Sequence, residues 1–62
     1  SLHMHLKHYL GKDIKVKTDD NRMMEGTLYR VEPERVKIKN KDKSKEFNMD
    51  EICFLEIKHD HP

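Results

Sequence analysis

The 62-residue sequence predicts a mainly β protein, in which a short N-terminal helix precedes a five-stranded antiparallel sheet bent strongly into a small barrel. Apolar and polar residues alternate in several short runs, which is typical of half-buried strands. The intervals between the runs are too short for the crossover helices that parallel strands need. Gly26 lies in the middle of the longest run, where a glycine weakens a strand unless a bend or close packing requires it.

Residues 4–10, ahead of the first strand, have helical spacing. Leu6 and Leu10 lie four positions apart with Tyr9 beside them, which places these three side chains on one apolar stripe. Gly11 follows at the position where glycine often ends a helix. These residues predict one short helix.

Five runs with strand character follow, separated by residues that favour turns. In the first run, Ile14 and Val16 face one side and charged residues face the other. The second run is long enough to turn a corner, with the bend expected at Gly26. The last run is apolar at four successive positions, which predicts a strand covered on both faces or sharing its outer face with a neighbouring molecule. The predicted strands are residues 13–18, 22–31, 35–40, 46–49 and 52–57.

The composition limits the classes of function. A chain of 62 residues forms one domain at most, here expected over residues 4–58, with 1–3 a possible tag remnant and 59–62 a C-terminal tail. The net charge of +1 gives no global attraction to nucleic acid or membranes, so such binding would need a local patch. The single cysteine and the lack of a long apolar run predict a cytoplasmic protein without a membrane partner.

Catalytic and metal chemistry have little support in the sequence. It holds no evident nucleophile, base and acid set and no glycine-rich phosphate loop. Cys53 lies in the most apolar run and is interpreted as a buried, inert thiol. His5 and His8 at one end, and His59 and His61 at the other, could chelate a metal, but nothing orients their rings. We therefore expect no enzyme, no cofactor and no metal site.

Two stretches of sequence carry a family resemblance. Residues 12–16 read Lys-Asp-Ile-Lys-Val, residues 26–28 read Gly-Thr-Leu, and the acidic Glu32 follows six positions after the glycine. A second motif occupies residues 47–52, Phe-Asn-Met-Asp-Glu-Ile. Over residues 6–57 the chain resembles a divergent member of the Sm-like family, which includes the LSm proteins and the bacterial host-factor riboregulators.

The resemblance implies an SH3-like or Sm-like barrel, a ring of subunits joined through the last two strands, and RNA held by two loops. In the corresponding loops, residues 32–35 and 48–50, Arg35 and Asn48 can donate to a base or phosphate. The first loop also carries two acids, and the basic pair that the family has in the second loop is missing here. The expected oligomer interface consists of Phe47, Ile52, Cys53, Phe54 and Leu55.

Lysines recur at every second position from Lys37 to Lys45, so an extended hairpin would place them on one side. This predicts either a surface that follows a phosphate backbone or a solvated face that protects a sheet edge. Tyr29 is expected on the outer face, where it stacks a base or packs at an edge. The candidate RNA-binding residues are Arg35, Lys37, Lys39, Asn48, Lys15, Lys17 and Tyr29.

Two functions from different classes follow. The first is an RNA-binding, homo-oligomeric Sm-like ring that scaffolds uridine- or adenine-rich single strands in riboregulation or RNA processing. The second is an Sm-fold assembly module that binds proteins through its edge strands and does not bind RNA. The lysine face favours the first function, and the missing basic pair favours the second.

Overall fold

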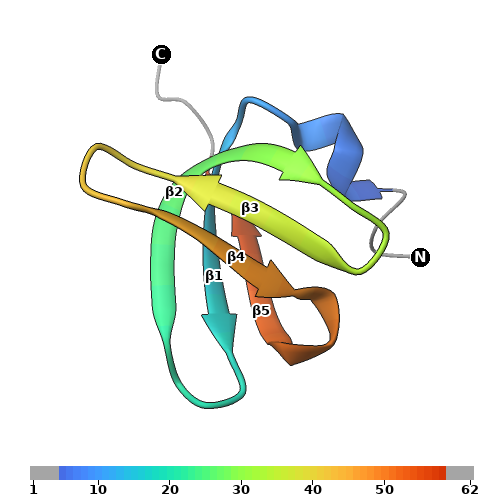
Figure 1. Ribbon diagram of the computed structural model, residues 1–62, viewed down its shortest axis with the longest axis vertical. Coiled ribbons are helices and arrows are strands. Elements are labelled where there is room, and N and C mark those ends of the chain that lie inside the picture. Colours follow the sequence, from blue (N-terminus) through green and yellow to red (C-terminus); the bar gives the residue numbers. More distant parts are fainter. Residues whose placement is uncertain (1–4, 59–62) are drawn as a thin grey trace.

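The computed structural model describes residues 5–58 and contains one five-stranded antiparallel sheet, ordered β4-β3-β2-β1-β5 (Figure 1). The strands predicted from the alternation of apolar and polar residues are confirmed, each to within two residues at either end. The elements are η1 (Lys7–Tyr9), β1 (Asp13–Thr18), β2 (Met23–Val31), β3 (Arg35–Lys39), β4 (Ser44–Asn48), η2 (Met49–Glu51) and β5 (Ile52–Ile57), where η1 and η2 are 3-10 turns.

The expected N-terminal helix is not supported. In the described part of this segment, His5 and Leu6 have helical conformation and lead directly into the 3-10 turn η1. Of the expected apolar stripe only Leu6 is buried, while Tyr9 and Leu10 are exposed. Gly11 has a φ of +86°, and its N–H donates to the Leu28 carbonyl oxygen at 2.8 Å. The chain reverses here to enter β1, which ends the turn on its C-terminal side.

The expected closed barrel is also wrong. Within residues 5–58, β4 and β5 form the two outer strands of the sheet and are not paired with each other. The short turn η2 joins them and directs β5 onto β1, so each strand keeps one backbone edge without a strand partner in the described chain. The molecule is therefore a strongly bent open sheet (Figure 1).

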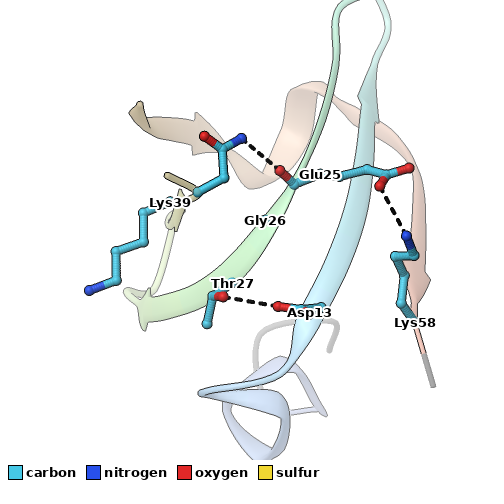
Figure 2. Close-up of a pocket in the computed structure, with 7 residues that line it drawn as sticks. Asp13, Glu25, Gly26, Thr27, Lys39 and Lys58 are labelled. Carbon is cyan, nitrogen blue, oxygen red and sulfur yellow. Dashed lines mark hydrogen bonds and ion pairs between the residues drawn. The ribbon is translucent and has the colours of Figure 1, made fainter. Parts of the chain in front are cut away.

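Strand β2 carries the bend because its two halves pair with different strands. β1 pairs with residues 23–27 and β3 pairs with residues 27–31. Gly26 precedes Thr27, the one residue of β2 that pairs with both neighbours. A Cβ atom at Gly26 would lie 2.5 Å from the carbonyl oxygen of Lys39 (Figure 2) and 2.9 Å from Cγ2 of Ile38. Of the two reasons expected for this glycine, a bend or close packing, close packing is confirmed.

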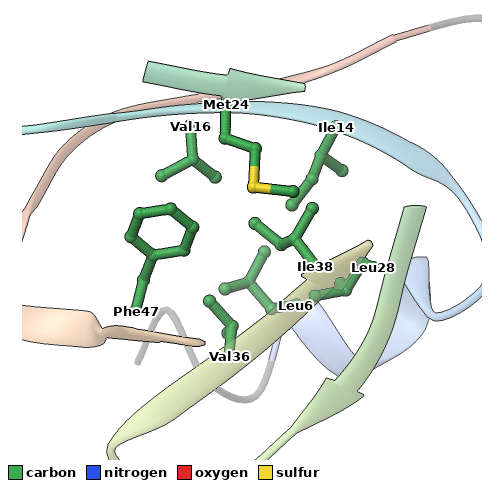
Figure 3. Close-up of a cluster of buried hydrophobic side chains, with 8 residues drawn as sticks. All are labelled: Leu6, Ile14, Val16, Met24, Leu28, Val36, Ile38 and Phe47. Carbon is green, nitrogen blue, oxygen red and sulfur yellow. The ribbon is translucent and has the colours of Figure 1, made fainter. Parts of the chain in front are cut away.

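The concave face of the bent sheet holds the hydrophobic core (Figure 3). β5 contributes only partly buried side chains to it, because the sheet stays open beside this strand. The buried set joins side chains of four strands, from β4 at one end of the strand order to β1 next to the other end, so packing across the bend holds the fold together. Its members are Leu6, Ile14, Val16, Met24, Leu28, Val36, Ile38 and Phe47.

The thiol of Cys53, on strand β5, is not buried as expected. A bulge in the pairing of β1 with β5 leaves Cys53 between Phe54, opposite Lys17, and Ile52, opposite Thr18. Cys53 is exposed, with its Sγ 3.5 Å from the Lys17 carbonyl oxygen. The interpretation as a buried thiol is wrong because a bulge turns side chains out of the regular alternation.

Some expectations concern residues that the structure does not describe. The possible tag remnant, the C-terminal tail and the pair His59 and His61 lie outside residues 5–58. Within that range, no three His, Cys, Asp or Glu side chains are grouped so that they could hold a metal ion. No helix in the same range has the length and apolar character needed to cross a membrane.

Gly26→Ala is expected to lower the free energy of unfolding by about 1–3 kcal/mol, the usual cost of overpacking. The reduced freedom of the unfolded chain would return at most about 1 kcal/mol, and the Lys39 backbone that the new methyl group meets cannot rotate away. Urea denaturation followed by circular dichroism measures the change.

Met23→Ala, on the same strand but 53% exposed, serves as the control and should stay within about 0.5 kcal/mol of the wild type. Equal stability of the two variants would contradict the role assigned to the glycine.

Candidate nucleic-acid interface

The convex outer face of the sheet carries most of the candidate RNA-binding side chains. Residues at the core-facing positions of β1 and β3 are buried, so the alternating Lys15, Lys17, Lys37 and Lys39 lie on the opposite face. This part of the predicted lysine face is confirmed. Figure 1 shows the β3–β4 hairpin as an arm that extends beyond the rest of the sheet.

The expected row of five lysines, however, is broken at the hairpin turn. Lys45 pairs across the strands with the buried Ile38, which places it on the inner side of β4. Lys39 pairs with Ser44, so the four residues between them, which include Lys41 and Lys43, form the connection. Four turn residues change the phase of the alternation, so the prediction that all five share one side is wrong.

Carboxylates neutralise the cations in the middle of the outer face. Glu46 lies opposite Lys37 in the strand pairing, and its Oε1 is 3.8 Å from Lys37 Nζ and 3.7 Å from Arg35 Nε. Lys15 Nζ is 4.0 Å from a carboxylate oxygen of Glu25. Exposed pairs of this kind add little to stability, because water and salt screen them. They also reduce the positive potential that a phosphate would meet here.

In and next to the loop before β3, two arginines form ion pairs with one carboxylate. Arg30 Nε lies 3.0 Å from Glu32 Oε1, and Arg35 Nε lies 3.5 Å from Glu32 Oε2. Burial raises the pKa of Glu32, but the hydrogen bonds and charges of Arg30 and Arg35 outweigh it and lower that pKa below its ordinary value. Arg35 is therefore committed to two carboxylates, those of Glu32 and Glu46.

Three exposed lysines near the end of the hairpin differ from these paired cations. Lys39, Lys41 and Lys43, called the hairpin-tip lysines below, form no ion pair with any other residue of the described range 5–58. The one acidic residue of the intervening turn is Asp42. Lys17 on β1 and Lys45 on β4 also have no ion pair within this range, but only at the hairpin tip do three such lysines lie within five residues of sequence.

Tyr29 lies beside the hairpin-tip lysines. Its hydroxyl group forms a hydrogen bond of 2.7 Å with Oγ of Ser44, and Lys39 Nζ is 5.0 Å from the centroid of its ring. Side chains of β2, β3 and β4 therefore meet at one place. The sequence pattern did not single out Ser44, because only the strand pairing places it opposite Lys39.

A shallow hollow of about 230 Å³ adjoins Lys39 on the outer face (Figure 2). Asn40 fixes its rim: its Nδ2 donates to the Glu25 carbonyl oxygen at 2.9 Å, and its Oδ1 accepts from the N–H groups of Asp42 and Lys43. One side chain thus ties the hairpin turn to β2 at the point where the β2–β3 ladder stops. The hollow is lined by Asp13, Glu25, Gly26, Thr27, Lys39, Asn40 and Lys58.

The two loops that the resemblance assigns to RNA do meet. Met49 N–H donates to the Glu34 carbonyl oxygen at 2.8 Å, and Asn48 pairs with Arg35 across the strands. A second hollow, of about 410 Å³, lies between these loops and is lined by Pro33, Glu34, Asn48, Met49 and Asp50. Two of its five lining residues are acidic and none is basic, so its charge does not favour phosphate.

The expected oligomer residues occupy different environments. The side chain of Phe47 is 1% exposed and packs in the core of its own chain, so a second subunit could contact this residue only through its backbone, on the outer strand β4. Ile52 and Leu55 are partly buried, and Cys53 and Phe54 are exposed. β5 therefore offers apolar contact area next to a free backbone edge.

The ion pair in the first hollow leads to a pH prediction. A hydrogen bond and the charge of Lys58, whose Nζ is 3.0 Å from the carboxylate, lower the pKa of Glu25 below its ordinary 4.5. Lys58→Met is expected to return this pKa toward 4.5, measured by NMR titration of the carboxyl carbon. Because the folded pKa is depressed, the pair stabilises the fold above the unfolded value and ceases to do so as the pH falls through the folded value. As the pH falls from above 4.5 through the lower folded pKa of Glu25, the wild type should lose more stability than Lys58→Met. An unchanged Glu25 pKa in the variant would contradict the ion pair.

Comparisons with known proteins assign no family to this chain. No family model, no curated protein and no solved structure matches it. Its function is therefore inferred from its own residues and contacts.

Proposed function

We propose that this chain is a divergent Sm-like protein that binds RNA and assembles into a homo-oligomeric ring, which acts as a scaffold for RNA. The observation that carries the proposal is the cluster of hairpin-tip lysines, which have no carboxylate partner among residues 5–58, whereas Lys15, Arg35 and Lys37 of the outer face are paired. Unpaired ammonium groups on flexible stems bind phosphates without reading sequence. A ring would repeat this weak site and raise the overall affinity through avidity.

The open sheet supports the assembly part of the proposal. β4 and β5 each keep a free backbone edge within the described chain, and β5 adds the exposed Phe54 and the partly buried Leu55. Pairing of β4 in one copy with β5 in the next would satisfy both edges and cover apolar surface. The bend at Gly26 agrees with the family resemblance, in which a bent second strand brings the edges into position.

The RNA expected at this surface is single-stranded and rich in uridine or adenine, and the process is riboregulation or RNA processing. Residues Arg35 and Asn48, expected at the RNA loops, contribute less than the hairpin tip in this proposal, since Arg35 is already paired. The cytoplasmic location expected from the single cysteine is part of the proposal, and the exposed thiol of Cys53 is compatible with a reducing compartment.

A second candidate function is that of an assembly module that binds proteins through its edge strands and does not bind RNA. The specific observation in its favour is the acidic hollow between the two loops, with Glu34 and Asp50 in its lining. Carboxylates at this place would repel phosphate and attract a basic protein segment. The two candidates differ in whether any RNA is bound at low salt.

Binding of labelled uridine-rich and adenine-rich RNA, measured by fluorescence anisotropy against salt concentration, tests the proposal. Lys41→Met and Lys43→Met should each weaken binding and lower the slope of log K against log salt by about 0.7, because each removes one phosphate contact to a single strand. Lys15→Met, which removes an ion-paired lysine, is the control and should change the slope less. If the wild type binds no RNA at about 50 mM salt, the RNA function is wrong and the assembly module is favoured.

The ring is tested separately by the mass of the protein in solution. Sedimentation or light scattering should give a mass several times the 7.5 kDa of one chain. Phe54→Glu, which puts a charge on the free edge strand outside the core, should reduce this mass while leaving the sheet folded. A monomeric wild type would rule out the ring.

A further inference from the structure

We infer that Tyr29 is a preformed stacking platform for a nucleobase and that it makes this surface selective for single-stranded over double-stranded RNA. The inference rests on the proposed RNA-binding function and adds the residue that selects single strands, together with the contacts that prepare it. It stands on three observations: where Tyr29 lies in the strand pairing, how its ring is held, and what covers the ring in the free protein.

Tyr29 lies at an irregularity in the pairing of β2 with β3. Leu28 pairs with Ile38 and Arg30 pairs with the next residue, Lys37, so Tyr29 is left over on β2 without a partner of its own. A bulge of this kind re-aims a side chain, and here the ring is 39% exposed although the neighbouring Leu28 is fully buried. The aromatic ring is thus presented on the outer face and is not needed in the core.

The ring is held at its far end. The Tyr29 hydroxyl group and Ser44 Oγ are 2.7 Å apart, and Ser44 stands on β4, on the other side of β3. The side chain therefore reaches across β3, and it is fixed at one end by its backbone and at the other by its hydroxyl group. A base that binds to a fixed ring loses less conformational freedom in the protein than one that must first order the ring.

In the free protein the ring carries a cation that RNA can replace. Lys39 Nζ lies 5.0 Å from the ring centroid, and an exposed cation–π contact of this kind changes an equilibrium constant by about 2- to 5-fold. A stacked base contributes about 5- to 150-fold. A stacked base is therefore expected to replace the Lys39 ammonium group on the ring, because its contribution to affinity is larger. The displaced ammonium group then becomes available to the adjacent phosphate.

The hairpin-tip lysines complete the site. Lys39, Lys41 and Lys43 lie on or next to the turn that begins one residue after Lys39, within reach of the backbone on either side of a stacked base. Their contacts are electrostatic and tolerate both single and double strands. A base in a duplex is already stacked and paired, so only an unpaired base can reach the Tyr29 ring. Selectivity for single strands thus comes from the tyrosine and not from the lysines.

The test compares Tyr29→Leu with the wild type on a labelled single-stranded RNA and on a duplex RNA of the same length. Tyr29→Leu should lose about 5- to 150-fold in affinity for the single strand, with an unchanged salt slope and unchanged duplex affinity. Tyr29→Phe, which keeps the ring, should retain affinity within about 3-fold. Tyr9→Leu is the matched control because Tyr9 is 38% exposed and lies outside the hairpin.

A spectroscopic measurement keeps the inference testable if Tyr29→Leu does not fold. The chain has two tyrosines and no tryptophan, so in Tyr9→Phe all tyrosine emission comes from Tyr29. Single-stranded RNA should quench this emission on binding, and duplex RNA should not.

The outcomes separate the two proposals. Two results would overturn the platform while RNA binding by the wild type stands. In one, Tyr29→Leu weakens single-strand and duplex binding equally; in the other, it weakens neither. If Tyr29 emission is unchanged when single-stranded RNA binds, the platform is overturned in the same way. If the wild type binds neither RNA at about 50 mM salt, the proposed function fails and the platform fails with it.

Discussion

The close passage of β3 over β2 at Gly26 is the constraint on which the rest of the structure depends. The carbonyl oxygen of Lys39 occupies the space that any side chain at this position would fill. Because β2 can bend there, one strand pairs with β1 along one half and with β3 along the other. This brings Phe47 of β4 into the same core as Val16 of β1 (Figure 3). It also carries the β3–β4 hairpin, with its lysines, out along the convex face.

The alternation of side chains was enough to predict the strands, because a period of two follows directly from burying one face of a sheet. The expectations of an N-terminal helix and a closed barrel failed. Both depend on how the connections direct the chain, and the alternation of side chains carries no information about that. At the N-terminus, Leu6 alone is needed by the core, and Gly11 reverses the chain. Between β4 and β5, three residues of η2 set the direction of β5, and no local pattern of apolar residues contains that information.

The sequence was enough to predict which residues belong to the candidate site, but not which of them contact one another. The sequence identifies the lysines and Tyr29, but the register decides that Glu46 lies opposite Lys37 and Ser44 opposite Lys39. A shift of one residue would pair different charges and leave the tyrosine hydroxyl group without its partner. Lys45 shows the same dependence, because the length of a turn, and not its own neighbours in sequence, turns it toward the inner side of the sheet.

The two outer strands of the sheet are chemically unlike. β4 is polar and bears Lys45 on its inner side, whereas β5 bears Leu55 on that side and the bulged Cys53 along its length. A contact between β4 of one copy and β5 of another would be heterologous, so it repeats a single rotation from copy to copy. Every hairpin would then point in the same sense about the axis of the assembly. Such an assembly would have polarity, because its two rims would present different side chains.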